Sequence, residues 1–296
     1  MNNCLVTKLK GVVNNDSILK LGEVKINFAD KGSASFSVYY DEEADLKIEG
    51  ASFKNEENTV LGNTMKASAG SQTKVFPTSR PCMISLFNKY AITKINSSGN
   101  GFDVDLAQLL QCKRMTSVIL NETQVHGNID GLSLMSNLSE IGFNTTDVSG
   151  DLSSLSHTTQ LTYLNFGKTK MSGDISTIAG NKGLKSLIVS NTNISGDVSV
   201  LSDLTGLATF SAYSNKLSGN INTLGRLTKL SEINFEDTLV TGDVKELGSA
   251  LHSNGKVSGT FQLVLNDRIT YNGATHNGKR VTMTFSASNV SYAINE

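Results

Sequence analysis

The chain has 296 residues, of which 26 are basic and 27 acidic, and its formal net charge is −1. This balance argues against nucleic acid or an anionic membrane surface as the partner. No apolar run approaches the ~20 residues that a membrane-spanning helix needs, so membrane insertion is not expected. The length is sufficient for more than one hydrophobic core.

Cysteine usage and the first residues bear on the compartment. The three cysteines, Cys4, Cys82 and Cys112, share no metal-ligand spacing and are too few for a disulfide framework. The opening "MNNCLVTKLKGVVNND" lacks the apolar core of a secretory signal. The sequence therefore predicts a reduced compartment and no classical export.

Residues 1–86 carry short apolar or alternating runs such as "ASFSVYY" and "DLKIEGASF", separated by polar stretches such as "YDEEAD". Alternation of this kind is typical of short strands joined by turns. The pattern predicts a small all-β N-terminal domain over 1–86, a candidate attachment domain. The polar stretch over 54–74 is predicted as loops.

A phrase of the form apolar-x-Gly-Asp/Asn-apolar then recurs six times. Its glycines are all 23 residues apart: Gly127, Gly150, Gly173, Gly196, Gly219 and Gly242. A fixed period of this length is typical of a solenoid. Stepping back one period makes "ITKINSSGNGFDVDL" a degenerate first coil with Val104 in place of the glycine. The sequence thus predicts a solenoid of about seven coils over 87–247.

Each position of the repeat has a physical interpretation. Apolar triplets such as Leu161, Leu164 and Phe166 precede the phrase, and their last two members alternate as in a strand with one buried face. Three residues later comes a threonine or asparagine, which can satisfy backbone groups at a turn. The glycine permits a positive φ at a sharp corner, and the Asp or Asn beside it can bond to nearby amides.

Residues 248–296 do not repeat. "KVSGTFQLVLNDRITYNG" and "RVTMTFSASNVSYAI" indicate strands joined by Gly/Asn turns. Because the end of a solenoid needs a cover, this segment is predicted to be a β-rich C-terminal cap.

The pattern L-x-x-L-x-L-x-x-T-x-L-S-G-D-I resembles the leucine-rich repeat, and its SGDI phrase is similar to the plant-specific subclass. Threonine replaces the family's asparagine in five coils, the period is 23 rather than 24, and the proline that often follows is absent. The resemblance implies a solenoid with a parallel β-sheet on its concave face.

Catalytic and metal motifs are missing from the sequence, so no cofactor, no metal and no catalytic residue is expected. The four histidines show no metal-ligand spacing, and there is no nucleophile elbow or P-loop. Asp103 and Asp105 have a calcium-like spacing, but Asp105 falls in the corner column. Asp151, Asp174 and Asp197 stack on consecutive coils, where turn amides or a cation could offset their repulsion.

The strand face left exposed is the candidate binding surface, polar with two tyrosines and an acidic end. Tyrosine with asparagine and serine is a common contact chemistry, and carbohydrate is also compatible. A merely solvated sheet is the alternative. The candidates on this face are Glu140, Asn144, Tyr163, Asn165, Lys168, Tyr213, Glu232, Asn234, Glu236 and Asp237.

The opening "MNNCLVTKLKGVVNNDSILKLGEVKI" resembles the N-terminal segments of virion-associated proteins of crAss-like phages of Bacteroidales. The resemblance implies a non-enzymatic structural or adhesion protein, located on the virion after synthesis in the host cytoplasm. Its partners would be other virion proteins and a protein or glycan of the host surface. One alternative is an intracellular bacterial protein-interaction module, located in the cytoplasm. Another is a glycan-active enzyme using Glu232 and Glu236.

Overall fold

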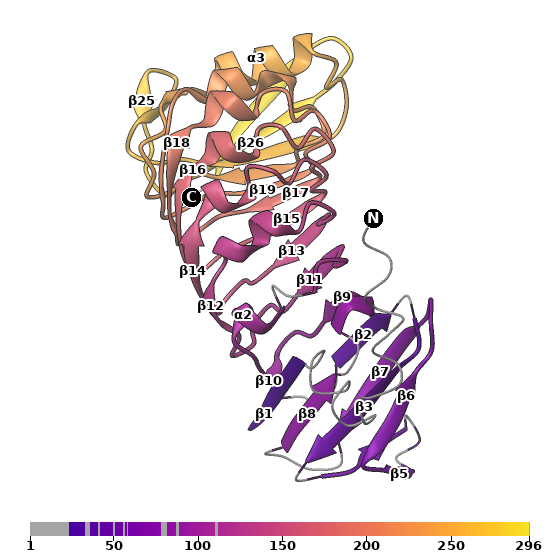
Figure 1. The fold of residues 1–296 in the computed structure, drawn as a ribbon. Coiled ribbons are helices and arrows are strands. Elements are labelled where there is room, and N and C mark those ends of the chain that lie inside the picture. Colours follow the sequence, from indigo (N-terminus) through magenta and orange to yellow (C-terminus); the bar gives the residue numbers. More distant parts are fainter. Residues whose placement is uncertain are drawn as a thin grey trace, which may run out of the picture.

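The structure is a computed structural model and describes residues 24–32, 36–40, 42–49, 51–55, 57, 59–77, 82–86, 89–109 and 112–295. Each repeat forms one coil of a solenoid, and the coils stack with their strands side by side (Figure 1). This confirms the predicted solenoid.

Each coil begins with a short strand of the long sheet. These strands are parallel and pair in a 23-residue register, so that Ser117 faces Glu140 and Glu140 faces Tyr163. They are β9 (Ile92–Asn96), β11 (Ser117–Ile119), β13 (Glu140–Gly142), β15 (Tyr163–Asn165), β17 (Ser186–Ile188), β19 (Thr209–Ser211) and β21 (Glu232–Asn234).

The corner phrase supplies a second parallel sheet and is followed by a 3-10 helix in each of five coils. The second sheet consists of β12 (His126–Asn128), β14 (Asp147–Asp151), β16 (Lys170–Asp174), β18 (Asn193–Asp197) and β20 (Lys216–Ser218). The 3-10 helices are η3 (Asp130–Leu134), η4 (Leu152–Leu155), η5 (Ile175–Ile178), η6 (Val198–Leu201) and η7 (Ile221–Arg226). The first coil carries α2 (Leu106–Leu109) in the equivalent place.

The core fills the space that these elements enclose. All members of the apolar triplets are at most 2% exposed. Aromatic members also contact each other between coils: the rings of Phe143 and Phe166 stack at 6.1 Å, and those of Phe210 and Phe235 meet edge to face at 5.9 Å. Burial of this kind is the main stabilising term of a fold, and here each coil depends on its neighbours to achieve it.

At the corner, the glycine has two reasons to lack a side chain. All six glycines have φ between 96° and 137°, a region that other residues rarely adopt. A Cβ on Gly196 would also lie 2.7 Å from Oδ1 of Asp174, the aspartate of the preceding coil. In the first coil Val104 is buried and does not have a positive φ.

The residues beside the glycine join the coils. The serine hydroxyl donates to the carbonyl of the glycine one coil back, as Ser172 does to Gly150 at 3.2 Å and Ser218 to Gly196 at 3.3 Å. Asp174 accepts a hydrogen bond from the backbone N–H of Ser176 at 2.8 Å. Asp105, Asn128, Asp151, Asp197, Asn220 and Asp243 accept equivalent bonds. All of them except Asn128 therefore cap the helical turn that follows, while the N-cap of η3 is Ile129.

The N-terminal part consists of β1 (Val24–Gly32), β2 (Phe36–Tyr40), β3 (Ala44–Glu49), β4 (Phe53–Lys54), β5 (Val60–Gly62), β6 (Thr64–Ala67), β7 (Gln72–Pro77) and β8 (Cys82–Leu86). The loops predicted over 54–74 are thus wrong, because β5, β6 and part of β7 lie there. Antiparallel pairing to distant strands, such as β6 to β3, creates these strands.

Two strand pairs join this part to the first coil. β2 is antiparallel to β9, and β1 is antiparallel to β10 (Asn100–Asp103). Phe36 and Phe102 add an edge-to-face ring contact at 5.4 Å. After β8, the 3-10 helix η2 (Lys89–Ala91) leads into β9. The long sheet therefore continues from the N-terminal strands into the repeats. The domain boundaries after residues 86 and 247 stay a prediction.

At the other end, β22 (Gly242–Asp243) and α3 (Val244–Ser253) replace the usual corner and 3-10 helix. β23 (Thr260–Val264) follows and is parallel to β21, so it adds a further strand to the long sheet. β24 (Ile269–Tyr271) pairs with β22 and with β25 (Ala274–Thr275). β26 (Arg280–Phe285) and β27 (Val290–Asn295) then turn antiparallel and end the 14-stranded sheet. No helix within the described residues is long and apolar enough to cross a membrane.

A methyl group at the corner tests the stacking. We expect Gly196→Ala to lower the free energy of unfolding by at least about 1–2 kcal/mol, because a side chain is strained at this φ and meets Asp174. Gly180→Ala is the matched control, since nothing lies within 4 Å of its added Cβ, and it should change stability by less than about 0.5 kcal/mol. Urea unfolding measures both, and equal effects would contradict the stacking argument.

The capping carboxylates predict a loss of stability in acid. Hydrogen bonds from Ser153 hold the pKa of Asp151 below its usual value, and those from Ser176 do the same for Asp174. Their stabilisation is present above the unfolded pKa and is lost as pH falls through the folded pKa. We expect Asp174→Asn to keep the cap and to be about as stable as wild type near neutral pH. Between about pH 5 and about pH 2.5 it should lose less stability than wild type does. Denaturant midpoints against pH would show this, and identical slopes would refute it.

Candidate functional site

A depression of about 340 Å³ lies on the solvent-facing side of the 14-stranded sheet, here called the sheet face. Tyr39 of β2 and Tyr163 of β15 bound it, four strands apart in the order β2-β9-β11-β13-β15. At the usual strand spacing this is about 19 Å. Ser117 and Ile119 of β11 line it between them. We call it the tyrosine depression.

Two opposite charges lie within the tyrosine depression. Lys94 and Glu140 flank Ser117 in one row across the sheet, one strand away on either side. The ammonium of Lys94 lies 5.6 Å from the ring centre of Tyr39, in a cation–π contact. The hydroxyl of Tyr163 accepts a hydrogen bond from Nδ2 of Asn165 at 3.0 Å. Both tyrosines are therefore held by neighbours while remaining partly exposed.

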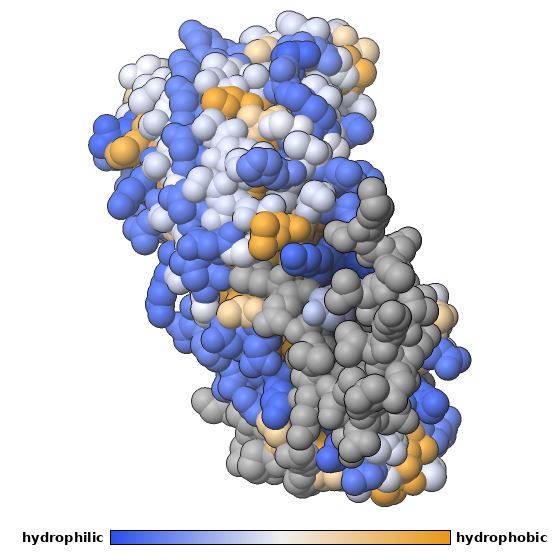
Figure 2. Space-filling view, viewed as in Figure 1, coloured by the Kyte–Doolittle hydropathy of each residue, from blue (hydrophilic) through white to orange (hydrophobic). Residues whose placement is uncertain are grey.

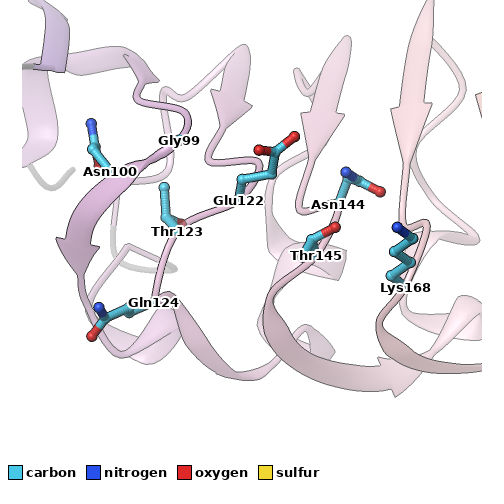
Figure 3. A pocket seen from close by; sticks show the side chains of 8 residues that line it. All are labelled: Gly99, Asn100, Glu122, Thr123, Gln124, Asn144, Thr145 and Lys168. Carbon is cyan, nitrogen blue, oxygen red and sulfur yellow. The ribbon is translucent and has the colours of Figure 1, made fainter. Parts of the chain in front are cut away.

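A second, more polar groove of about 630 Å³ follows the turns at the end of the same strands (Figure 3). Figure 3 shows Glu122, Asn144 and Lys168 succeeding one another on three neighbouring coils. Gly99, Asn100, Thr123, Gln124 and Thr145 complete the lining. We call it the edge groove. It carries a basic side chain, Lys168, at one end and an acidic one, Glu122, two coils away.

The backbone of the edge groove is left-handed at one residue per coil. Gly99, Glu122, Thr145 and Lys168 have φ between 55° and 64°, and Asn191, Ser214 and Asp237 continue the column at 52–53°. Such a conformation costs a residue other than glycine about 1–2 kcal/mol. It is least suited to a β-branched residue such as Thr145. The coils thus hold polar side chains on turns that glycine would fit better.

The structure distributes the ten sequence candidates between several places. Glu140 and Tyr163 line the tyrosine depression, and Asn144 and Lys168 line the edge groove. Asn165 and Asn234 are used internally, because their Oδ1 atoms accept hydrogen bonds from the N–H groups of Gly167 and Glu236. Tyr213 is partly exposed away from both depressions.

The predicted acidic end of the sheet face is partly neutralised. Arg280 of β26 forms an ion pair with Glu232 at 3.2 Å. Asp237 accepts a hydrogen bond from the hydroxyl of Ser214 at 3.2 Å. Glu236 follows the strand and lies beside Gly278 of the cap. Glu232 and Glu236 therefore have different environments, and the former is already paired.

The structure adds five residues to the tyrosine depression that the ten sequence candidates did not include, namely Tyr39, Lys94, Asn96, Ser117 and Ile119. Lys94 and Asn96 lie one period before Ser117 and Ile119, so the 23-residue step could have identified them. Tyr39 had no such signal, because β2 joins the sheet through an antiparallel pairing with β9. Within the described part of the chain, no three His, Cys, Asp or Glu side chains gather as metal ligands would.

The fold is that of a leucine-rich repeat solenoid. The Arabidopsis receptor kinase HAESA, solved with the peptide hormone IDA and the co-receptor SERK1, matches with a TM-score of 0.51 at 22% identity. The match covers 63% of this chain and 32% of that one. An internalin, InlF of Listeria monocytogenes, matches at 23% identity and a TM-score of 0.45, over 62% of this chain and 48% of that one.

The chain thus spans less than half the length of these solved structures. No protein-family model matches it, and no curated protein does. The likeness to HAESA shows the fold of the repeats, and the activity and partners of this chain must be argued from its own surface.

A glycine in place of Thr145 tests whether the left-handed backbone at the edge groove lowers the stability of the chain. We expect Thr145→Gly to raise the free energy of unfolding by about 0.5–1 kcal/mol, since glycine adopts this φ without strain. The control is Thr146→Gly, which should destabilise because the Thr146 hydroxyl donates to the carbonyl of Phe143 at 2.6 Å. Thermal or urea unfolding gives both values, and a destabilising Thr145→Gly would contradict the prediction.

Proposed function

We propose that the chain is a non-enzymatic recognition protein that binds a partner protein across the tyrosine depression. The observation that carries this proposal is the pair Tyr39 and Tyr163, held partly exposed on either side of Lys94 and Glu140. Tyrosine offers a large, rigid and amphipathic contact surface and is enriched at protein interfaces. The opposite charges would select the orientation of the partner.

The tyrosine depression is a better candidate for a binding site than the rest of the described surface. On the face that Figure 2 shows, apolar residues in the coloured part form small separate patches among hydrophilic ones. Of the large exposed apolar residues of the described chain, Val60 and Leu61 are neighbours in β5, and the others, including Leu134 and Leu239, come from separate segments. The tyrosine depression, by contrast, joins aromatic, apolar and charged groups on one rigid sheet. Sites on such a scaffold are well positioned for recognition.

The edge groove extends the same surface. A partner lying across the tyrosine depression would reach the turns that follow β11, β13 and β15, where Glu122, Asn144 and Lys168 offer hydrogen bonds and charge. HAESA, which shares the fold, has been solved with a bound peptide hormone. This supports a protein or peptide ligand for the present chain.

We further propose that a phage particle carries this protein, which is made in the host cytoplasm. Support comes from the opening residues, which resemble virion-associated proteins of crAss-like phages. Residues 1–23 of that opening lie outside the described residues. On this proposal the N-terminal strands attach the protein to the particle, and the solenoid presents its sheet face to the partner.

Two linked measurements test the proposal. Peptide mass spectrometry compares particles purified from a phage-producing Bacteroidales culture with the cleared cytoplasm. We expect the chain in the particles at a fixed ratio to capsid or tail proteins. Purified chain with the photo-crosslinker benzoylphenylalanine at position 163 is then irradiated with particles and host cells, and we expect one crosslinked protein.

The matched control carries the crosslinker at position 213, a partly exposed tyrosine outside both depressions. Equal crosslinking from positions 163 and 213 would contradict a site at the tyrosine depression. A chain found only in the cytoplasm would refute the virion proposal. In that case, crosslinking in cytoplasmic extract would test the interaction-module alternative.

A further inference from the structure

The last strand of the 14-stranded sheet, β27, has one unpaired edge in the described part of the chain. It pairs with β26 along its full length, from Val290 opposite Phe285 to Asn295 opposite Arg280. Its other side has no neighbouring strand in the sheet order. Edge strands of this kind readily pair with another chain unless charges, proline, a bulge or a covering segment prevents it.

Hydrogen bonding of β26 fixes which groups of β27 point outward. The N–H of Phe285 bonds to Gly259 and that of Leu265 to Lys279, so the odd-numbered residues of β26 face β23. In an antiparallel ladder the bonding side alternates. The even-numbered residues therefore bond to Ser291, Ala293 and Asn295 of β27. The N–H and C=O groups of Val290, Tyr292 and Ile294 point away from the sheet.

This edge lacks the usual protection. The sequence of β27, VSYAIN, contains no charged residue and no proline. Ile294 is 41% exposed although it lies on the same side of the strand as the half-buried Val290 and Tyr292. The opposite end of the long sheet differs, because β4 and β5 have only two and three residues and their pairing is irregular. Short, irregular edges discourage further pairing.

The strand is also rigid and self-complementary. The Tyr292 ring packs against Gly248 and lies 6.0 Å from Tyr271, and its hydroxyl donates to the carbonyl of Lys245. An antiparallel pair with a two-fold axis at Tyr292 places Val290 opposite Ile294 of the second copy. The three outward-pointing residues then form three bonded pairs, each with two hydrogen bonds. The exposed Ile294 side chain gains an apolar neighbour, and no like charges meet.

We propose that β27 pairs with β27 of a second copy, so that the chain forms a two-fold symmetric dimer with one sheet continuing across both molecules. The register that pairs the outward-pointing N–H and C=O groups of the two strands also places Val290 opposite Ile294. This agreement favours a second copy over an unrelated strand. Two-fold dimers with one self-complementary patch are the commonest homo-oligomers. This dimer would present two tyrosine depressions, and it does not depend on what they bind.

Sedimentation equilibrium and light scattering over a concentration series test the dimer. We expect the mass to rise from 31.7 kDa toward 2 × 31.7 = 63.4 kDa, with a Kd in the micromolar range. Ile294→Lys should stay monomeric and folded, since the side chain is already 41% exposed and a charged lysine opposite Val290 of the second copy would oppose association. Leu239→Lys, at another exposed aliphatic residue, should dimerise as wild type does.

A second variant removes an outward-pointing hydrogen-bond donor of β27 without disturbing its pairing with β26. Ile294→Pro removes an N–H that points outward and leaves the bonds of Ser291, Ala293 and Asn295 to β26 in place. We expect it to be a folded monomer by circular dichroism. A wild-type chain that remains at 31.7 kDa at about 200 µM, or variants that dimerise as well as wild type does, would overturn the proposal.

Discussion

Close stacking at the corner is the constraint on which the other features of the solenoid depend. Each corner glycine lies beneath the aspartate or asparagine of the preceding coil, where no Cβ has room. Except for Asn128, that aspartate or asparagine also caps its own 3-10 or α-helical turn, as Asp151 and Asp174 do. The serine before the glycine donates to the preceding glycine's carbonyl. An inserted residue would break all three relations at once, which explains a period held at 23 residues from Gly127 to Gly242.

The threonine column shows how a local bond can replace one between coils. Thr123, Thr146, Thr169, Thr192 and Thr238 donate to the carbonyl three residues before them in their own coil. Asn215 is longer and reaches the carbonyl of Val189 in the preceding coil. Asn266 of the cap bonds to Thr238 and Val240 in the same way. The threonines of this column therefore satisfy the turn locally, and the corner serines add side-chain bonds between coils.

The ends of the solenoid explain the position of the candidate site. The parallel part of the long sheet ends at β9 and at β23. Antiparallel strands extend the sheet beyond both, β2 beside β9 and β26 beside β23. At the first end this pairing brings Tyr39 into the same row as Lys94, Glu140 and Tyr163. The tyrosine depression is thus a product of the junction between two kinds of sheet. At the last end, β27 has a strand neighbour on one side only among the described residues.

The repeat could be predicted from the sequence alone, because a residue that must be buried or left-handed in one coil must be so 23 residues later. Leu164, Gly173 and Asp174 could be assigned to core and corner from this period alone, and Lys94 and Asn96 could have been found by it. Three features became visible only in the folded chain: the partners of Tyr39, the pairing of Glu232 with Arg280, and the strands over 54–74. These depend on antiparallel contacts between segments far apart in the chain, which no local periodicity encodes.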